Sequence, residues 1–120
     1  MLHTHLDHIE DEQTFQKVLH DNENVMLCCG REGPMCLPVY DVMEKLKDKY
    51  PNVAFHDMDF DGAASHLIRS LPQTRSFSGL PFTVYFKKGK VVGATSSIQT
   101  KQQVKDMLER AFPSASTAAA

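Results

Sequence analysis

An α/β fold with one central mixed sheet is the architecture that this sequence predicts, and three observations support it. Val25–Cys29 is a continuous apolar run with the length of a strand that is covered on both faces. From residue 6 to residue 71, strand-like segments alternate with segments of helical apolar spacing. Phe82–Phe86 and Lys90–Thr95 flank Lys88-Gly89, which is typical of a β-hairpin. The predicted order is β-α-β-α-β-α-β-β-α, with helices on both faces of the sheet.

Each remaining element has its own signal. Apolar residues at helical spacing predict a first helix that ends at Asp21, and an imperfect alternation predicts a strand over Val53–Asp59. Thr100-Lys101-Gln102-Gln103 has the form of a capping box, so the last helix begins there and stops before Pro113. The other predicted elements are a short first strand over Leu6–Glu10 and a short third helix over Gly62–Leu71, which Pro72 ends.

The second helix is predicted to open at Pro34, where the fixed φ angle and the missing N–H of proline cost nothing. Pro38 lies one turn further on and is expected to bend this helix, because it removes a backbone hydrogen bond. The helix ends at Tyr50-Pro51-Asn52. Its predicted buried stripe consists of Val39, Val42, Met43 and Leu46.

Length and composition bound the class of protein. The 120 residues suit one domain, which we place at residues 6–112 between a flexible N-terminus (1–5) and a disordered tail (113–120). A net charge of −2 and the absence of a basic patch argue against nucleic-acid binding, and no apolar run is long enough for a membrane span. The N-terminus lacks the apolar core of a signal peptide, and three cysteines suit a reducing compartment. We therefore expect a cytoplasmic monomer without a cofactor.

Two segments carry a family resemblance. Gly33-Pro34-Met35-Cys36 looks like a Cys-Pro-x-Cys redox motif at the head of a helix, with its leading cysteine replaced by Gly33. Gly79-Leu80-Pro81, followed by the strand and turn up to Gly89, looks like the proline-led strand that faces such a motif. With the predicted element order, these segments make the chain resemble the thioredoxin family over Leu6–Phe112. The resemblance implies a thioredoxin fold and a role in thiol–disulfide exchange and cell redox homeostasis.

The family's functional residues map only in part onto this chain. The attacking cysteine falls at Gly33 and the resolving cysteine at Cys36. The family's tryptophan falls at Glu32, its buried aspartate at Leu27 and the lysine neighbour of that aspartate at Phe55. The frame of the site is thus retained, while most of the catalytic side chains are replaced.

A second alignment is possible, in which Cys29-Gly30-Arg31-Glu32 is paired with Cys-Gly-Pro-Cys. It keeps an attacking cysteine at Cys29 but has no resolving one. It also places the helix start directly behind the strand and discards the match at Tyr50. We therefore favour the alignment through Cys36.

Cys36 is the predicted catalytic residue. It lies near the N-terminus of a helix, where free backbone N–H groups and the helix dipole favour a thiolate. Because Gly33 has no side chain, we expect Cys36 to be more exposed than a resolving cysteine normally is. A small buried hydrophobe at a helix start is the alternative interpretation. Cys28 and Cys29 point to opposite faces of a strand and are assigned to core packing.

Pro81 is predicted to follow a cis peptide bond, as the resemblance implies; a trans proline at the start of a strand is the alternative. A cis turn presents the Leu80 backbone beside Cys36, where an extended peptide can pair with it. The predicted substrate-binding residues are Gly33, Pro34, Met35, Leu80 and Pro81, with an apolar rim formed by Phe77, Leu80 and Phe82.

Three functions compete. The first is a residual oxidoreductase in which Cys36 forms mixed disulfides with protein or small-molecule thiols, which an external thiol resolves. The second is a non-catalytic module that holds a peptide in the Gly33–Pro81 groove. The third rests on His3, His5 and His8, because Met1-Leu2-His3 has the form of an amino-terminal copper or nickel site. Since any histidine at position three satisfies that pattern, we assign no metal site.

Overall fold

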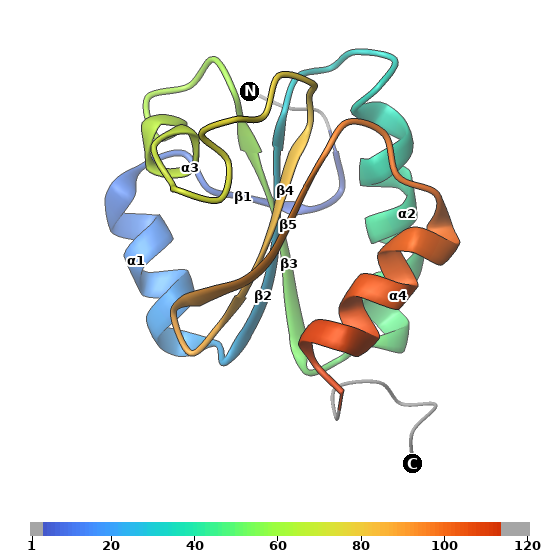
Figure 1. The fold of residues 1–120 in the computed structure, drawn as a ribbon. Helices are drawn as coiled ribbons and strands as arrows, with labels where there is room; N and C mark the ends of the chain where they lie inside the picture. The colour runs from blue at the N-terminus through green and yellow to red at the C-terminus, as the bar shows by residue number, and fades with distance from the viewer. Residues whose placement is uncertain (1–3, 114–120) are drawn as a thin grey trace.

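The computed structural model describes residues 4–113 and consists of one five-stranded sheet with helices on both faces. Figure 1 shows the sheet edge-on, with α1 and α3 on one face and α2 and α4 on the other. The elements in chain order are β1 (Asp7–His8), α1 (Glu12–Asp21), β2 (Asn24–Gly30), α2 (Leu37–Leu46), a 3₁₀ turn η1 (Lys47–Lys49), β3 (Val53–Asp59), α3 (His66–Arg69), β4 (Phe82–Lys87), β5 (Lys90–Ser96) and α4 (Lys101–Ala111).

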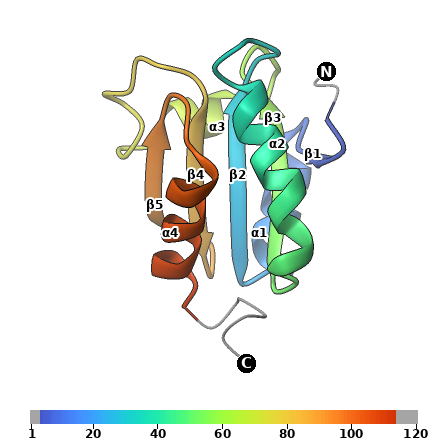
Figure 2. The same ribbon diagram turned by 90° about the vertical axis from the view of Figure 1, so that its right-hand side faces the viewer.

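The strand order is β1-β3-β2-β4-β5, and β2 lies at the centre (Figure 2). β1 and β2 both pair with β3 in parallel, whereas β4 pairs with β2 and with β5 in antiparallel fashion. The mixed sheet and the element order confirm the predicted fold class. The order also places the carboxyl end of β2 beside the beginning of β4. Cys36 lies in the segment that follows β2, and Pro81 directly precedes β4.

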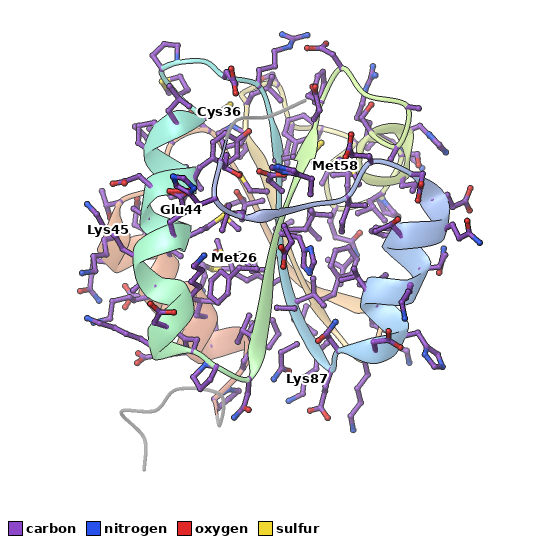
Figure 3. All side chains as sticks on the ribbon, turned by 180° about the vertical axis from the view of Figure 1, so that it is seen from behind. Met26, Cys36, Glu44, Lys45, Met58 and Lys87 are labelled. Atoms are coloured by element: carbon purple, nitrogen blue, oxygen red, sulfur yellow. The ribbon has the colours of Figure 1, made fainter. Side chains whose placement is uncertain are left out.

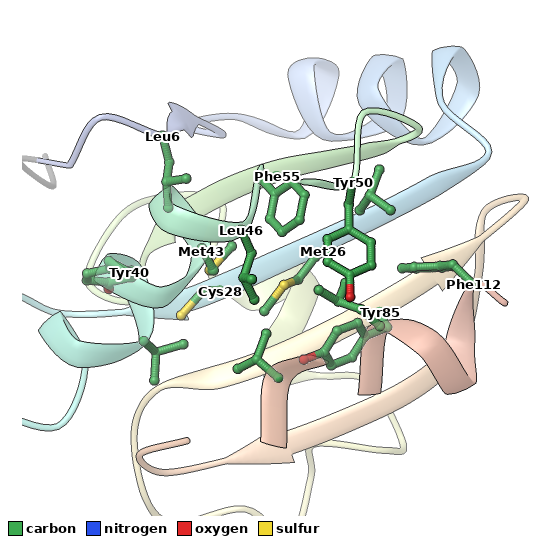
Figure 4. Close-up of a cluster of buried hydrophobic side chains, with 14 of the residues drawn as sticks. Leu6, Met26, Cys28, Tyr40, Met43, Leu46, Tyr50, Phe55, Tyr85 and Phe112 are labelled. Atoms are coloured by element: carbon green, nitrogen blue, oxygen red, sulfur yellow. The ribbon is translucent and has the colours of Figure 1, made fainter. Parts of the chain in front are cut away.

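The sheet separates two apolar cores, one on each of its faces. The core between the sheet and α2 and α4 contains Met26, Cys28 and Tyr85, and part of it is shown in Figure 4. The core on the α1 and α3 face contains Leu27, Cys29 and further residues. Because successive strand residues point to opposite faces, the run of apolar residues in β2 supplies both cores.

Side-chain hydrogen bonds cap the beginnings of helices α1 and α4. The Asp11 carboxylate accepts a hydrogen bond from the Thr14 amide at 2.7 Å and caps α1. The Thr100 hydroxyl accepts from the Gln103 amide at 3.1 Å, and the Gln103 side chain accepts from the Thr100 amide at 2.8 Å. This reciprocal pair is the capping box predicted for α4. No helix in residues 4–113 has the length and apolar character needed to cross a membrane.

The third helix is shorter than predicted. Residues 60–65 form turns, and α3 covers only His66–Arg69 rather than Gly62–Leu71. Around it the backbone makes bonds across three residues, for example from the Leu67 amide to the Ala64 carbonyl and from the Leu71 amide to the Ile68 carbonyl. These are tight 3₁₀-type turns, which are used in short pieces.

The second helix begins three residues later than predicted, at Leu37. The Gly33 carbonyl accepts bonds from the Cys36 and Leu37 amides at 3.0 Å each, so residues 33–37 already form a helical turn. Pro38 has no N–H to continue this pattern, and regular helix is established only after that turn. The turn before Pro38 carries Cys36.

Candidate functional site

Cys36 lies at the N-cap of α2 (Figure 3). Its side chain is only 2% exposed, so the expectation of an unusually accessible thiol was wrong. The turn from Gly33 folds the sulfur inward, beneath the end of β2. The Arg31 amide points at the Cys36 Sγ from 3.4 Å, which gives the sulfur one backbone donor.

Gly30 is the residue against which Cys36 packs. A Cβ atom at Gly30 would lie 2.8 Å from the Cys36 Sγ, 2.7 Å from the Tyr40 hydroxyl and 3.0 Å from the Pro81 Cβ. Distances below 3.0 Å do not allow a side chain without movement of a neighbour. Glycine at this position therefore brings the thiol, the tyrosine hydroxyl and the proline ring together around one backbone site.

Gly33 has the opposite surroundings. A Cβ atom there would have no atom within 4 Å outside its chain neighbours. The position that the resemblance assigns to the attacking cysteine is therefore open. A larger side chain fits at residue 33 without displacing any neighbour.

The Leu80–Pro81 peptide bond is cis, as predicted. Pro81 is buried, and its carbonyl and that of Gly79 both accept a bond from the Ser97 amide at 3.1 Å. The beginning of β4 is thus fixed to the end of β5. Pro81 and Cys36 meet at Gly30, which confirms the predicted juxtaposition of the two motifs.

The apolar surface near Cys36 differs from the predicted rim. Phe82 is buried and packs edge-on against Phe77, with ring centroids 5.6 Å apart, so Phe82 belongs to the core. Met35, Leu37 and Ile98 are instead exposed, at 43%, 48% and 45%. Met35 and Leu37 flank Cys36 in the chain, and Ile98 follows the segment that is bonded to Pro81. Of the predicted substrate-binding residues, Pro34 is also exposed, and Gly33 and Leu80 are half-buried.

Cys28 and Cys29 are fully buried in β2, as predicted for core residues. Burial raises the pKa of the Cys29 thiol to about 12, and it raises the pKa of Cys28 well above its usual value. The second alignment, with Cys29 as the attacking residue, is therefore wrong. Cys29 lies inside the strand rather than on a helix-opening turn.

An arginine–phenylalanine cluster holds the segment that precedes Cys36. Arg31 forms a bidentate ion pair with Asp61, at 2.8 and 2.9 Å. The guanidinium groups of Arg31 and Arg69 lie 5.1 and 4.8 Å from the centroid of the Phe60 ring. The Phe60 amide also donates to the Gly30 carbonyl at 2.8 Å. These contacts join the ends of β2 and β3 beside the site.

A buried carboxylate that the sequence analysis missed lies in β3. Leu27 and Phe55, at the positions of the family's aspartate and lysine, are both buried apolar residues. Asp57 is fully buried and lies in register with Cys28 of β2. Alternation along β3 could have found it, because Val53, Phe55 and Asp57 share one buried face.

The histidines form no metal site in the described part of the chain, where no cluster of three or more potential ligands occurs. His8 Nδ1 lies 2.6 Å from the Asp57 Oδ1, and the two side chains form a hydrogen-bonded pair. His5 uses its backbone instead and donates to Glu44 at 2.6 Å. The predicted Met1-Leu2-His3 motif lies outside the described residues.

No protein-family model matches the chain, and no curated protein matches it by sequence. Solved structures do match. The oxidised thioredoxin from Plasmodium falciparum has a TM-score of 0.72 at 17% identity, covering 88% of this chain and 96% of that one.

Two further thioredoxins give similar values. A mutant thioredoxin from Halobacterium salinarum NRC-1 has a TM-score of 0.74 at 22% identity, covering 88% of each chain. Thioredoxin O2 from Arabidopsis thaliana, in its oxidised state, has a TM-score of 0.71 at 18% identity, covering 92% of this chain and 97% of that one. The protein therefore has the thioredoxin fold.

Proposed function

We propose that this thioredoxin-fold protein acts in thiol–disulfide exchange through a single thiol, Cys36, and so contributes to cell redox homeostasis. The observation that carries the proposal is the position of Cys36: its sulfur lies at the start of α2, has the Arg31 amide as a donor and meets Pro81 at Gly30. Backbone donors at a helix start are favourable neighbours of a reacting sulfur.

The chemistry needs two external sulfur compounds. The Cys36 thiolate attacks a disulfide of a protein or a small molecule; one new S–S bond forms, and the other half of that disulfide leaves as a thiolate, which takes a proton from water. An external thiolate then attacks the sulfur of the substrate half in the mixed disulfide, forms a new disulfide with that half and releases Cys36 as a thiolate. A second external thiol attacks this new disulfide and frees the substrate half as a thiol. Two electrons have then passed from two external thiols, which become a disulfide, to the original disulfide.

The replaced side chains limit this activity. No cysteine stands at residue 33 to attack first, and Leu27 leaves the family's acid–base position apolar. Cys36 also needs a local movement of the 33–36 turn before it meets a substrate, since its side chain is 2% exposed. We therefore expect slow exchange with small disulfides and negligible turnover with a thioredoxin reductase.

The low exposure of Cys36 favours a second candidate, a peptide-binding module without exchange. Met35 and Leu37, on either side of Cys36 in the chain, and Ile98, which follows the Ser97 bonded to Pro81, are exposed apolar side chains that a docked peptide strand could contact. In this case the groove binds its partner whether or not Cys36 carries a thiol.

Glutathione disulfide separates the two candidates. The native protein and the Cys36→Ser variant are incubated with it at neutral pH, and mixed disulfides are located by peptide mass spectrometry. The exchange proposal predicts an adduct on Cys36 that is absent from Cys36→Ser and retained by the control Cys29→Ser. No adduct on Cys36 in the folded native protein would reject exchange and leave the binding module.

A further inference from the structure

Residues 4–9 cross the sheet edge over β3 and α2, and we call them the N-terminal strap. Only two of them, Asp7 and His8, pair with β3 as strand β1. Leu6 enters the core beneath α2, and Ile9 enters the core on the other face. The strap is therefore held by two apolar side chains, a minimal strand and a set of polar contacts.

The polar contacts of the strap converge on one buried carboxylate. The Thr4 hydroxyl donates to the Asp57 Oδ2, and His8 Nδ1 lies 2.6 Å from the Asp57 Oδ1. The Ile9 amide donates to the Asp57 carbonyl at 2.8 Å. Both carboxylate oxygens of Asp57 are thus covered by side chains that belong to the strap. Without the strap, water would solvate this carboxylate.

Two weaker ties join the strap to α2. The His5 amide donates to Glu44 at 2.6 Å, and the Lys47 ammonium donates to the His5 carbonyl at 3.3 Å. Figure 3 shows Glu44 on the side of α2 that faces the strap. Both ties are exposed to solvent, so they contribute less than the buried contacts with Asp57.

The surroundings of Asp57 offer little compensation for a negative charge. Cys28 lies beside it in β2, Tyr40 packs nearby from α2, and His8 and His56 are the histidines that interact with it. No lysine or arginine in residues 4–113 forms an ion pair with it. His8 itself borders a cavity of about 150 Å³ that Glu10 and Asp59 also line.

We propose that the N-terminal strap is a pH-responsive element, closed when Asp57 is protonated and loosened when Asp57 is ionised. An ionised carboxylate beneath the strap lacks the hydration that it gains when the strap opens. A neutral carboxyl loses much less hydration free energy by remaining covered. The proposal concerns the strap alone and does not depend on thiol exchange at Cys36.

The direction of the pH dependence follows from the linkage between protonation of Asp57 and closure of the strap. Burial raises the pKa of Asp57, although its hydrogen bonds to Thr4 and His8 act the other way. With the strap open, Asp57 is solvated and has an ordinary pKa. Since protons favour the state that binds them more tightly, acid favours the closed strap, and this preference is lost as the pH rises through the raised pKa.

Amide hydrogen exchange tests the proposal. NMR rates for the Ile9 amide are divided by the intrinsic peptide rate at each pH and compared with those for Leu27 in β2. We expect the relative protection of Ile9 to fall several-fold as the pH rises from about 4, near the ordinary aspartate pKa, to about 8. The Asp57→Asn variant should retain high protection throughout, whereas the control Asp106→Asn, on α4, should behave like the native protein.

A relative protection of Ile9 in the native protein that stays constant or rises with pH would overturn the proposal. Circular dichroism checks that Asp57→Asn is folded. If it is folded and still shows the native pH dependence, a group other than Asp57 is responsible and the proposal fails. If the variant does not fold, the native pH series decides alone.

Discussion

Cys36 and Asp57 are both buried polar groups on the α2 side of the sheet, but their surroundings differ in kind. The Asp57 carboxylate has a side-chain partner for each oxygen, and an entire chain segment closes over it. The Cys36 sulfur has one long contact with a backbone amide, and the Cβ position at Gly33, three residues earlier, has no atom within 4 Å outside its chain neighbours. The first group is closed in by a chain segment, and the second is reached when the 33–36 turn moves.

The difference lies in what surrounds each group. A helix start, a close contact with Gly30 and a cis-proline surround the Cys36 sulfur. Leu27, at the position that the resemblance assigns to an aspartate, is a buried apolar residue. The chain does contain a buried carboxylate, but its partners hold the N-terminal strap.

The largest expected effect is on the rate of disulfide reduction, when a second cysteine is added at residue 33. Gly33→Cys should raise insulin-disulfide reduction by at least about tenfold over the native protein, since residue 33 has room for a side chain and Cys36 lies three residues later. Turnover is measured with dithiothreitol as the reductant. Met35→Cys is the matched control, because it adds a thiol at the wrong spacing and should have little effect. Equal rates for both variants would exclude residue 33 as the attacking position.

Replacing each of two glycines by alanine compares a position that is packed against Cys36 with a position that is open. Gly30→Ala should lower the free energy of unfolding by about 1–3 kcal/mol, because the Cβ meets the Tyr40 hydroxyl and the Cys36 sulfur. Gly33→Ala should change it by no more than about 0.5 kcal/mol. Urea denaturation gives both values. Similar losses for both variants would contradict the packing described for Cys36.

One hydroxyl tests how firmly Asp57 is held. Thr4→Val removes a donor to the buried carboxylate and should lower the free energy of unfolding by about 1–3 kcal/mol, nearer the lower value because the strap can adjust. Thr95→Val is the control, since the buried Thr95 hydroxyl has no hydrogen-bond partner among the described residues. That variant should be neutral or stabilising. A Thr4→Val protein as stable as the native one would show that the carboxylate does not depend on the strap.

The smallest expected effect is on how the free energy of unfolding changes with pH. Because the folded protein raises the pKa of Asp57, it binds this proton more tightly than the unfolded chain does. The resulting stability is fully present below the ordinary aspartate pKa and is lost as the pH rises through the raised value. The unfolding free energy of Asp57→Asn should therefore exceed that of the native protein by an amount that grows with pH and then levels off. A difference that shrinks with pH would reverse the sign of this account.

Sequence reasoning succeeded where backbone constraints are local. The bounds of β3 were predicted as they occur, and the cis bond before Pro81 and the capping box at Thr100 are present. It was less accurate at the ends of helices. The third helix is reduced to His66–Arg69 by tight turns, and the start of α2 is displaced by the missing N–H of Pro38.

The sequence predicted the backbone arrangement of the site but not the burial of its side chains. Cys36 and Pro81 meet as expected, yet the burial of Cys36 depends on its close approach to Gly30, which no local pattern reveals. Tyr40 was missed for the same reason, since its ring packs into the core while its hydroxyl donates to the Arg31 carbonyl at 3.2 Å. Asp57 was overlooked although the alternation of β3 places it on the buried face.

The central claim is that Cys36 is the thiol of the site, and alkylation resolved by residue tests it most directly. The native protein is treated with iodoacetamide at neutral pH, and the rate at each cysteine is read by mass spectrometry. We predict that Cys36 reacts first, through opening of the 33–36 turn, while Cys28 and Cys29 react only at the rate of global unfolding because burial raises the pKa of both thiols. Modification of Cys29 before Cys36, or of all three cysteines together on unfolding, would contradict the assignment of Cys36.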